Sequence, residues 1–246
     1  MKKLVYLSTG GIGVIAVFYA IAVFLPFLTE DNEGAAQVVL LHGLGRSESA
    51  MLLLESHLLD AGFDVYNFGY PSNDQPPGVL VDMVSAEIDS CCAGNDRTMH
   101  LVGHSLGGLL IRAYLVDRRP TNLGRVVLLG SPNKGSELAD ESDAISTVLL
   151  DLAGPAARAL GTGEEDFAAG LPPPDFPVGV IAGTRDNPVS NQWLPLPNDG
   201  MVSVESARLE GMTDFTEFNV THWGLRNDGE VADQVVFFLN NEHFRH

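Results

Sequence analysis

Short apolar runs alternate with longer amphipathic segments along most of the chain after residue 35. The apolar runs have the length of buried strands and predict strands at residues 37–41, 64–68, 99–102, 125–129, 178–182 and 215–220. The segments between them predict helices at residues 49–61, 79–91, 106–117, 145–160 and 231–240. This alternation is typical of an α/β domain, with a mostly parallel sheet of about six strands and helices on both faces.

The part of the chain from residue 36 to residue 246 has the length of one α/β domain with a single core. An insert at residues 136–176 separates the fourth and fifth predicted strands, and three prolines, 172–174, follow its apolar positions. This insert is either a cap over a pocket or an ordinary packed helix. In open α/β sheets the functional residues lie on loops beyond the carboxyl ends of the strands, so we expect these loops to carry the chemistry.

The N-terminal segment is strongly apolar. Residues 4–28 contain no charged side chain, and Lys2 and Lys3 precede them. At about 1.5 Å per residue, a helix of this length can cross a hydrocarbon core of roughly 30 Å. We therefore expect residues 1–28 to be a transmembrane anchor and residues 29–35 to be a tether, with a cleaved signal sequence or a buried core helix as alternatives.

The flanking charges predict the orientation of this anchor. Two lysines precede the apolar run, and acidic residues follow it. This asymmetry favours a cytoplasmic N-terminus, which places the α/β domain on the periplasmic side of the membrane. If the segment is cleaved, the domain is secreted.

The composition excludes one class of partner and says little about the compartment. The chain has 32 acidic and 14 basic side chains and a net charge of −18, so it would be repelled by the phosphates of nucleic acids. Cys91 and Cys92 are the only cysteines and are sequence neighbours. A bridge between neighbours would be strained, so we expect no disulfide framework.

A Gly-x-Ser-x-Gly pattern stands between a predicted strand and a predicted helix. Residues 101–109 read Leu-Val-Gly-His-Ser-Leu-Gly-Gly-Leu, with the serine at position 105. Glycine is required on both sides where a strand turns sharply into a helix and leaves the serine exposed above the sheet edge. Ser105 is therefore a candidate nucleophile. A serine that only caps the following helix would not require both glycines.

A serine hydroxyl becomes an effective nucleophile when a histidine removes its proton and a carboxylate orients that histidine. His222 follows the last predicted strand, where its loop would face the serine. Two aspartates follow the fifth predicted strand, Asp186 beside Arg185 and Asp199 in a turn before an apolar pair. We favour Asp199, because a turn supplies backbone donors to a carboxylate, whereas Asp186 fits a surface ion pair.

Acyl transfer places negative charge on the former carbonyl oxygen, and two backbone N–H groups should stabilise it. Leu106, directly after the serine at the start of a predicted helix, supplies the first. Leu44, in the His-Gly-Leu-Gly loop after the first strand, is the expected second donor. His42 in the same loop is expected to brace the loop by hydrogen bonding rather than to move protons.

Four segments, in order, resemble the bacterial lipases and esterases of the α/β-hydrolase superfamily: residues 42–45, 103–108, 130–136 and 198–202. The resemblance extends from residue 36 to residue 240. It implies an α/β-hydrolase fold. It also implies that Asp199 is the acid of a triad with Ser105 and His222, and that Leu44 and Leu106 form the oxyanion hole.

Together these features predict a membrane-anchored serine hydrolase, an esterase or lipase that cleaves carboxylic esters through an acyl-enzyme intermediate. The expected partners are a small-molecule or lipid ester substrate and, through the N-terminal helix, a membrane. No cofactor and no metal are expected. Two other functions stay open: a thioesterase or deacylase of the same fold, and a non-catalytic binding module on an α/β-hydrolase scaffold.

Overall fold

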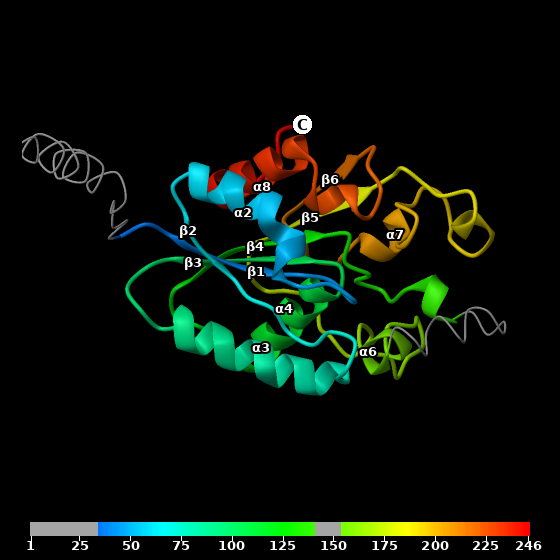
Figure 1. Ribbon diagram of the computed structural model, residues 1–246, viewed down its shortest axis with the longest axis horizontal. Coiled ribbons are helices and arrows are strands. Elements are labelled where there is room, and N and C mark those ends of the chain that lie inside the picture. Colours follow the sequence, from blue (N-terminus) through cyan, green and yellow to red (C-terminus); the bar gives the residue numbers. More distant parts are fainter. Residues whose placement is uncertain (1–33, 141–153) are drawn as a thin grey trace, which may run out of the picture. The chain divides into compact units, whose positions relative to one another are not determined.

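The computed structural model describes residues 34–140 and 154–246, which form a six-stranded sheet between two layers of helices (Figure 1). The strands are β1 (Gln37–Leu41), β2 (Asp64–Asn67), β3 (Met99–His104), β4 (Leu123–Leu129), β5 (Val178–Gly183) and β6 (Asp214–Phe218). Their order across the sheet is β2-β1-β3-β4-β5-β6, and every neighbouring pair is parallel. The predicted parallel α/β architecture is confirmed.

The helices largely occupy the segments where the apolar spacing predicts them. They are α2 (Leu52–Asp60), α3 (Pro77–Cys91), α4 (Leu106–Asp117), α6 (Pro155–Arg158), α7 (Val204–Ala207) and α8 (Gly229–Asn241). Short 3-10 turns lie at η2 (Glu48–Met51), η3 (Glu137–Asp140), η4 (Ser190–Gln192) and η5 (Gly224–Arg226). The bounds of α4 agree with the prediction, whereas the segment predicted as one helix at 49–61 divides into η2 and α2.

Each strand contributes side chains to two separate cores. In β1, Val39 and Leu41 pack with α3 and α4, while Val38 and Leu40 pack with α2 and α8, and all four are fully buried. Figure 1 shows the same division, with α2 and α8 on one face of the sheet and α3 and α4 on the other. Burial on both faces explains why this strand has an uninterrupted apolar sequence instead of an alternating one.

The prediction of one continuous helix at residues 145–160 is wrong. Gly154 has φ +89° and ψ −174°, which is not a helical conformation, and α6 begins only at Pro155. Proline suits the first position of a helix because its missing N–H would have no partner there. Ala156 and Leu160 are buried in the core, so this described part of the insert packs on the domain. Residues 141–153 lie outside the described residues.

The two cysteines also differ from the expectation, because Cys91 and Cys92 are joined by a disulfide. Helix α3 ends at Cys91, and Cys92 has already left the helix, with φ −139° and ψ −29°. This change of backbone direction lets the two side chains meet. A bridge between sequence neighbours closes no loop of chain, so it constrains the unfolded chain little.

The predicted span at residues 4–28 lies outside the described residues. Within residues 34–140 and 154–246, no helix is long and apolar enough to cross a membrane.

Candidate active site

Ser105 occupies the turn between β3 and α4 and has an unusual backbone conformation. Its φ is +55° and its ψ is −123°, a combination that costs a residue with a side chain about 1–3 kcal/mol. The Ser105 N–H donates to the carbonyl of Leu129 at 2.8 Å, and its carbonyl accepts from the N–H of Gly108 at 3.0 Å. These bonds tie the turn to β4 and to α4.

Two glycines beside Ser105 allow the turn to pack tightly. A Cβ on Gly103 would lie 2.5 Å from the backbone nitrogen of Gly108. A Cβ on Gly107 would lie 2.3 Å from the carbonyl oxygen of Leu41 in β1. Real Cβ atoms essentially never approach closer than 3.0 Å, so neither position accepts a side chain without movement of the backbone. The pattern around the serine therefore reflects close contact of α4 with β1 and β3.

Asp199 and His222 form a hydrogen-bonded pair. The Nδ1 atom of His222 lies 2.7 Å from Oδ2 of Asp199, and the His222 N–H donates to the Asp199 carbonyl at 2.8 Å. The other carboxylate oxygen accepts from the N–H groups of Met201 at 2.9 Å and Val202 at 2.8 Å. An ionised carboxylate only accepts, so Nδ1 carries the proton and Nε2 has a free lone pair. Asp199 is only 2% exposed, which protects this pair from water.

A glycine makes room for this pair. Gly130 follows β4 with φ +54°, and a Cβ there would lie 3.1 Å from Oδ2 of Asp199 and 3.2 Å from Nδ1 of His222. A side chain at this position would crowd both atoms of the hydrogen bond.

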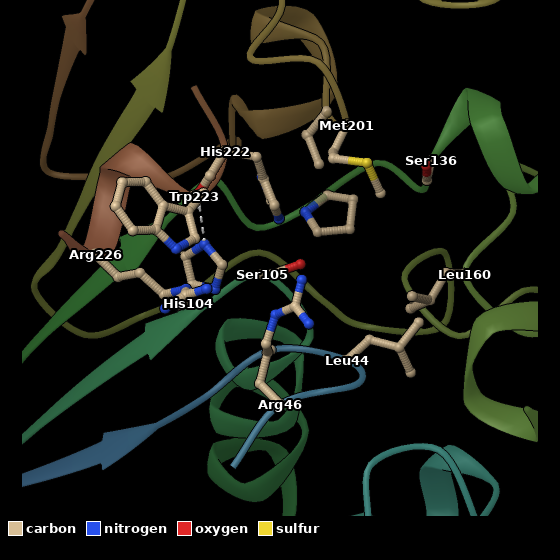
Figure 2. Close-up of a pocket in the computed structure, with 13 residues that line it drawn as sticks. Leu44, Arg46, His104, Ser105, Ser136, Leu160, Met201, His222, Trp223 and Arg226 are labelled. Atoms are coloured by element: carbon tan, nitrogen blue, oxygen red, sulfur yellow. Dashed lines mark hydrogen bonds between the residues drawn. The ribbon is translucent and has the colours of Figure 1, made fainter. Parts of the chain in front are cut away.

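Ser105 and His222 line the same cavity, whose volume is about 220 Å³ (Figure 2). Figure 2 shows Leu44 and Leu160 on one side of Ser105, and Trp223 and Arg226 on the other. The guanidinium group of Arg46 lies close to Ser105, so the cavity combines apolar side chains with two cations.

The two predicted oxyanion donors lie next to Ser105. Leu44 lines the cavity, and a Cβ on the preceding residue, Gly43, would lie 3.0 Å from the Cβ of Ser105. Leu106 is the first residue of α4, and the first N–H groups of a helix have no partner within that helix. Leu44 in the loop after β1 and Leu106 at the start of α4 therefore both adjoin the serine.

Asp186, the alternative acid, lies on the surface. Its side chain is exposed and accepts a hydrogen bond from the amide of Asn191. It does not line the cavity, and in the described structure it forms no ion pair with Arg185.

His42 braces the loop after β1. Its Nδ1 donates to the carbonyl of Gly43 at 2.9 Å, its Nε2 accepts from the N–H of Tyr70 at 3.2 Å, and the two rings stack with their centroids 4.0 Å apart. Burial lowers the pKa of His42. In a neutral ring with both nitrogens engaged, neither the N–H nor the lone pair is free for proton transfer, so His42 holds the loop.

His104 is a residue that sequence reasoning did not single out. Its Nε2 donates to the carbonyl of His222 at 2.9 Å, and the two rings lie 4.7 Å apart. Burial, followed by the neighbouring His222, holds the pKa of His104 well below its usual range. A neutral His104 therefore positions the loop of His222 without adding a charge beside it. The sequence feature that could have identified His104 is its position directly before Ser105.

Two arginines that sequence reasoning also passed over, Arg46 and Arg226, line the cavity. They come from the loop after β1 and from η5, and no sequence pattern links them. Among residues 34–140 and 154–246, no group of three or more His, Cys, Asp or Glu side chains could hold a metal ion.

Residues 38–234 match the model of the alpha/beta hydrolase family. The chain belongs to this family. A triacylglycerol lipase of Pseudarthrobacter phenanthrenivorans is 33% identical over 112 residues, which are 42% of this chain and 35% of the relative. A triacylglycerol lipase of Burkholderia plantarii is also 33% identical over 112 residues, 42% of this chain and 31% of the relative. The match thus spans about a third of the length of each relative.

Solved structures of other alpha/beta hydrolases share the fold. The mature form of the lipase BlEst2 from Bacillus licheniformis has a TM-score of 0.64 and 22% identity, and the match covers 85% of this chain and 92% of that one. At this identity the likeness concerns the fold.

The close contact at Gly107 predicts a loss of stability in this alpha/beta hydrolase when a methyl group is added. Gly107→Ala should lower the free energy of unfolding by about 1–3 kcal/mol, because the new Cβ meets backbone atoms of β1. Gly78→Ala in α3 is the matched control, since a Cβ there has nothing within 4 Å, and alanine favours a helix by about 0.5–1 kcal/mol. Urea unfolding measures both variants, and equal stabilities would contradict the packing argument.

Proposed function

We propose that this protein is a serine hydrolase that cleaves carboxylic ester bonds, as an esterase or lipase, through Ser105, His222 and Asp199. The observation that carries the proposal is the 2.7 Å hydrogen bond between His222 and Asp199, made by a ring that lines the same cavity as Ser105. A base oriented by a buried carboxylate, in the same cavity as a half-buried serine, is the arrangement that nucleophilic acyl transfer requires.

In the proposed reaction, Oγ of Ser105 attacks the ester carbonyl carbon while its proton passes to Nε2 of His222. The carbonyl electron pair moves to the oxygen, where the N–H groups of Leu44 and Leu106 bind the oxyanion. Asp199 stabilises the imidazolium. When the carbonyl re-forms, the alcohol leaves with the proton from His222 and the acyl group stays on Ser105. A water molecule activated by the same histidine then releases the acid and restores the serine.

The strained serine argues against a binding scaffold that lacks catalysis. A protein that only binds has no need to hold Ser105 at φ +55° at a cost of about 1–3 kcal/mol. The triacylglycerol lipases among the relatives support ester substrates. The same side chains could attack a thioester, so a chain-length series of 4-nitrophenyl esters, run beside the matching thioesters, compares the two leaving groups directly.

Ser105→Ala should abolish ester hydrolysis, because no other group would attack the carbonyl. We expect the rate to fall on the order of 10³-fold or more, together with the loss of labelling by a fluorophosphonate. Ser136→Ala is the matched control, since Ser136 lines the same cavity and has no place in the proposed reaction. Labelling of the Ser105→Ala variant at the level of the natural chain would remove Ser105 from the mechanism.

Asp199→Asn should reduce kcat far more than Asp186→Asn does. An amide at position 199 no longer stabilises the imidazolium and can favour the wrong tautomer of His222, a loss of about 10⁴-fold in a well-studied triad. Asp186→Asn changes an exposed side chain outside the cavity and should leave kcat within about twofold. Steady-state kinetics on a 4-nitrophenyl ester ranks the two variants, and the reverse order would assign the acid to Asp186.

We also propose that residues 4–28 anchor the chain in a membrane, with the catalytic domain on the periplasmic side. The uncharged run and the two lysines before it support this proposal. The full chain should sediment with membranes and stay there in high salt or alkaline carbonate. Val14→Glu combined with Val17→Arg should weaken insertion, since each charge costs about 2.5–3.5 kcal/mol at the centre of a span. Recovery of the intact natural chain in the supernatant would contradict the anchor.

A further inference from the structure

Two cations at the proposed active site have no acidic partner among the described residues. Arg226 is only 6% exposed, and its Nη1 donates to the carbonyl of Ala50 at 2.7 Å. The Nε atom of the same side chain is buried and has no hydrogen-bond partner in residues 34–140 and 154–246. Arg46 donates to the carbonyl of Gly45 at 3.1 Å, and neither guanidinium forms an ion pair with a described carboxylate.

The two guanidinium groups also affect each other unfavourably. Burial, and then the positive charge of Arg46, lower the pKa of Arg226. Both arginines also lower the pKa of His104, which lines the cavity and donates a hydrogen bond to the carbonyl of His222. The charge of Arg226 is buried and costly without a counter-charge, whereas Arg46 is exposed at the mouth of the same cavity. Buried groups with a perturbed pKa, such as Arg226, gather at functional sites.

The acidic composition of the chain makes two arginines without acidic partners among the described residues unexpected. The chain has 32 acidic side chains against 14 basic ones, so acidic partners are abundant. Two basic side chains nevertheless line the proposed catalytic cavity, and neither has an acidic partner within residues 34–140 and 154–246. An anion brought by the substrate would supply the missing partner, and it would also reduce the repulsion between the two guanidinium groups.

The positions of the arginines indicate which end of the substrate carries the anion. In Figure 2, Leu44 and Leu160 lie on one side of Ser105, and Arg226 lies on the other side beside His104. The guanidinium group of Arg46 lies close to Ser105 itself. An apolar acyl chain fits the side of the leucines. The alcohol part of the ester then extends past the guanidinium group of Arg46 beside the serine and toward Arg226.

We propose, on the basis of the esterase function above, that the substrate is an acyl ester whose alcohol part carries a phosphate or carboxylate group bound by Arg46 and Arg226. The planar guanidinium matches both anions through two parallel hydrogen bonds. A triacylglycerol carries no such group, so this assignment separates the chain from the substrate that the names of its relatives give.

The test compares three esters with the same acyl chain and the same three-carbon alcohol skeleton: 1-octanoylglycerol, 1-octanoylglycerol 3-phosphate and 3-octanoylglycerate. The full chain should show a kcat/KM at least about tenfold higher for one or both anionic esters than for the neutral ester, since a hydrogen bond to a charged group contributes roughly this factor. A preference for the phosphate or for the carboxylate identifies the anion. Equal values for all three esters would overturn the proposal.

Variants test whether the arginines are responsible. Arg46→Gln should lower the ratio of anionic to neutral kcat/KM by about tenfold, and Arg46→Lys should restore part of it because the charge returns. Arg226→Gln should act in the same direction, but its bond to Ala50 makes Arg46 the primary test. Arg119→Gln is the matched control. Arg119 forms an exposed ion pair with Asp175 and follows the C-terminal end of α4, whereas Ser105 precedes its N-terminal end. The variant removes the same charge and should leave the ratio of anionic to neutral kcat/KM unchanged.

Two further measurements separate this proposal from the esterase function. Hydrolysis of 4-nitrophenyl butyrate reports the ester chemistry alone, and its absence would overturn both proposals. Glycerol 3-phosphate and glycerate should compete with fluorophosphonate labelling of Ser105, whereas glycerol should not. Ester hydrolysis without either competition or anion preference would overturn only the anion site.

Discussion

Parallel hydrogen bonding between all six strands is the constraint on which the site depends. It brings the carboxyl ends of β1, β3, β5 and β6 to the same edge of the sheet. The loops that follow them carry Leu44, Ser105, Asp199 and His222. A strand spans about 17–20 Å, so the reversal of any one of these strands would move the proposed site residue that follows it to the opposite edge of the sheet.

The histidines near this edge have different roles, which their surroundings determine. His222 lies at the cavity and donates to the carboxylate of Asp199. His104 and His42 are buried, their pKa values are lowered, and backbone groups occupy their ring nitrogens in part or in full. Two neutral rings therefore hold the loops on either side of Ser105, while a third ring keeps a nitrogen available for a proton.

The site has a cost in folding free energy, which hydrogen bonds and packing around it offset. Ser105 has a strained backbone, and Asp199 is a carboxylate removed from water. Hydrogen bonds from Ser105 to Leu129 and from two N–H groups to the Asp199 carboxylate act directly against these costs. The two hydrophobic cores on either face of the sheet hold the strands that position these bonds.

Local patterns in the sequence predict much of the fold correctly. The apolar runs locate all six strands, and they are clearest where a strand is covered on both faces, as in the fully buried strands β1, β3 and β5. The edge strands β2 and β6 are only partly buried and carry polar side chains. The sequence Gly-His-Ser-Leu-Gly locates the turn at Ser105, since that turn and its close contacts exclude side chains at Gly103 and Gly107. The helix at 145–160 is predicted wrongly because the apolar spacing continues through Gly154, where the backbone leaves the helical region.

The sequence by itself determined the class of the fold and the strand-to-helix turn at Ser105. It also reduced the candidate acids to Asp186 and Asp199. Each of these results depends on side chains that are close together in the chain. Only the tertiary structure decided that Asp199 contacts His222 while Asp186 lies at the surface. It also decided that Arg46 and Arg226 share one cavity. Distances between residues far apart in the chain depend on how loops from different strands pack, and no local pattern of residues contains that information.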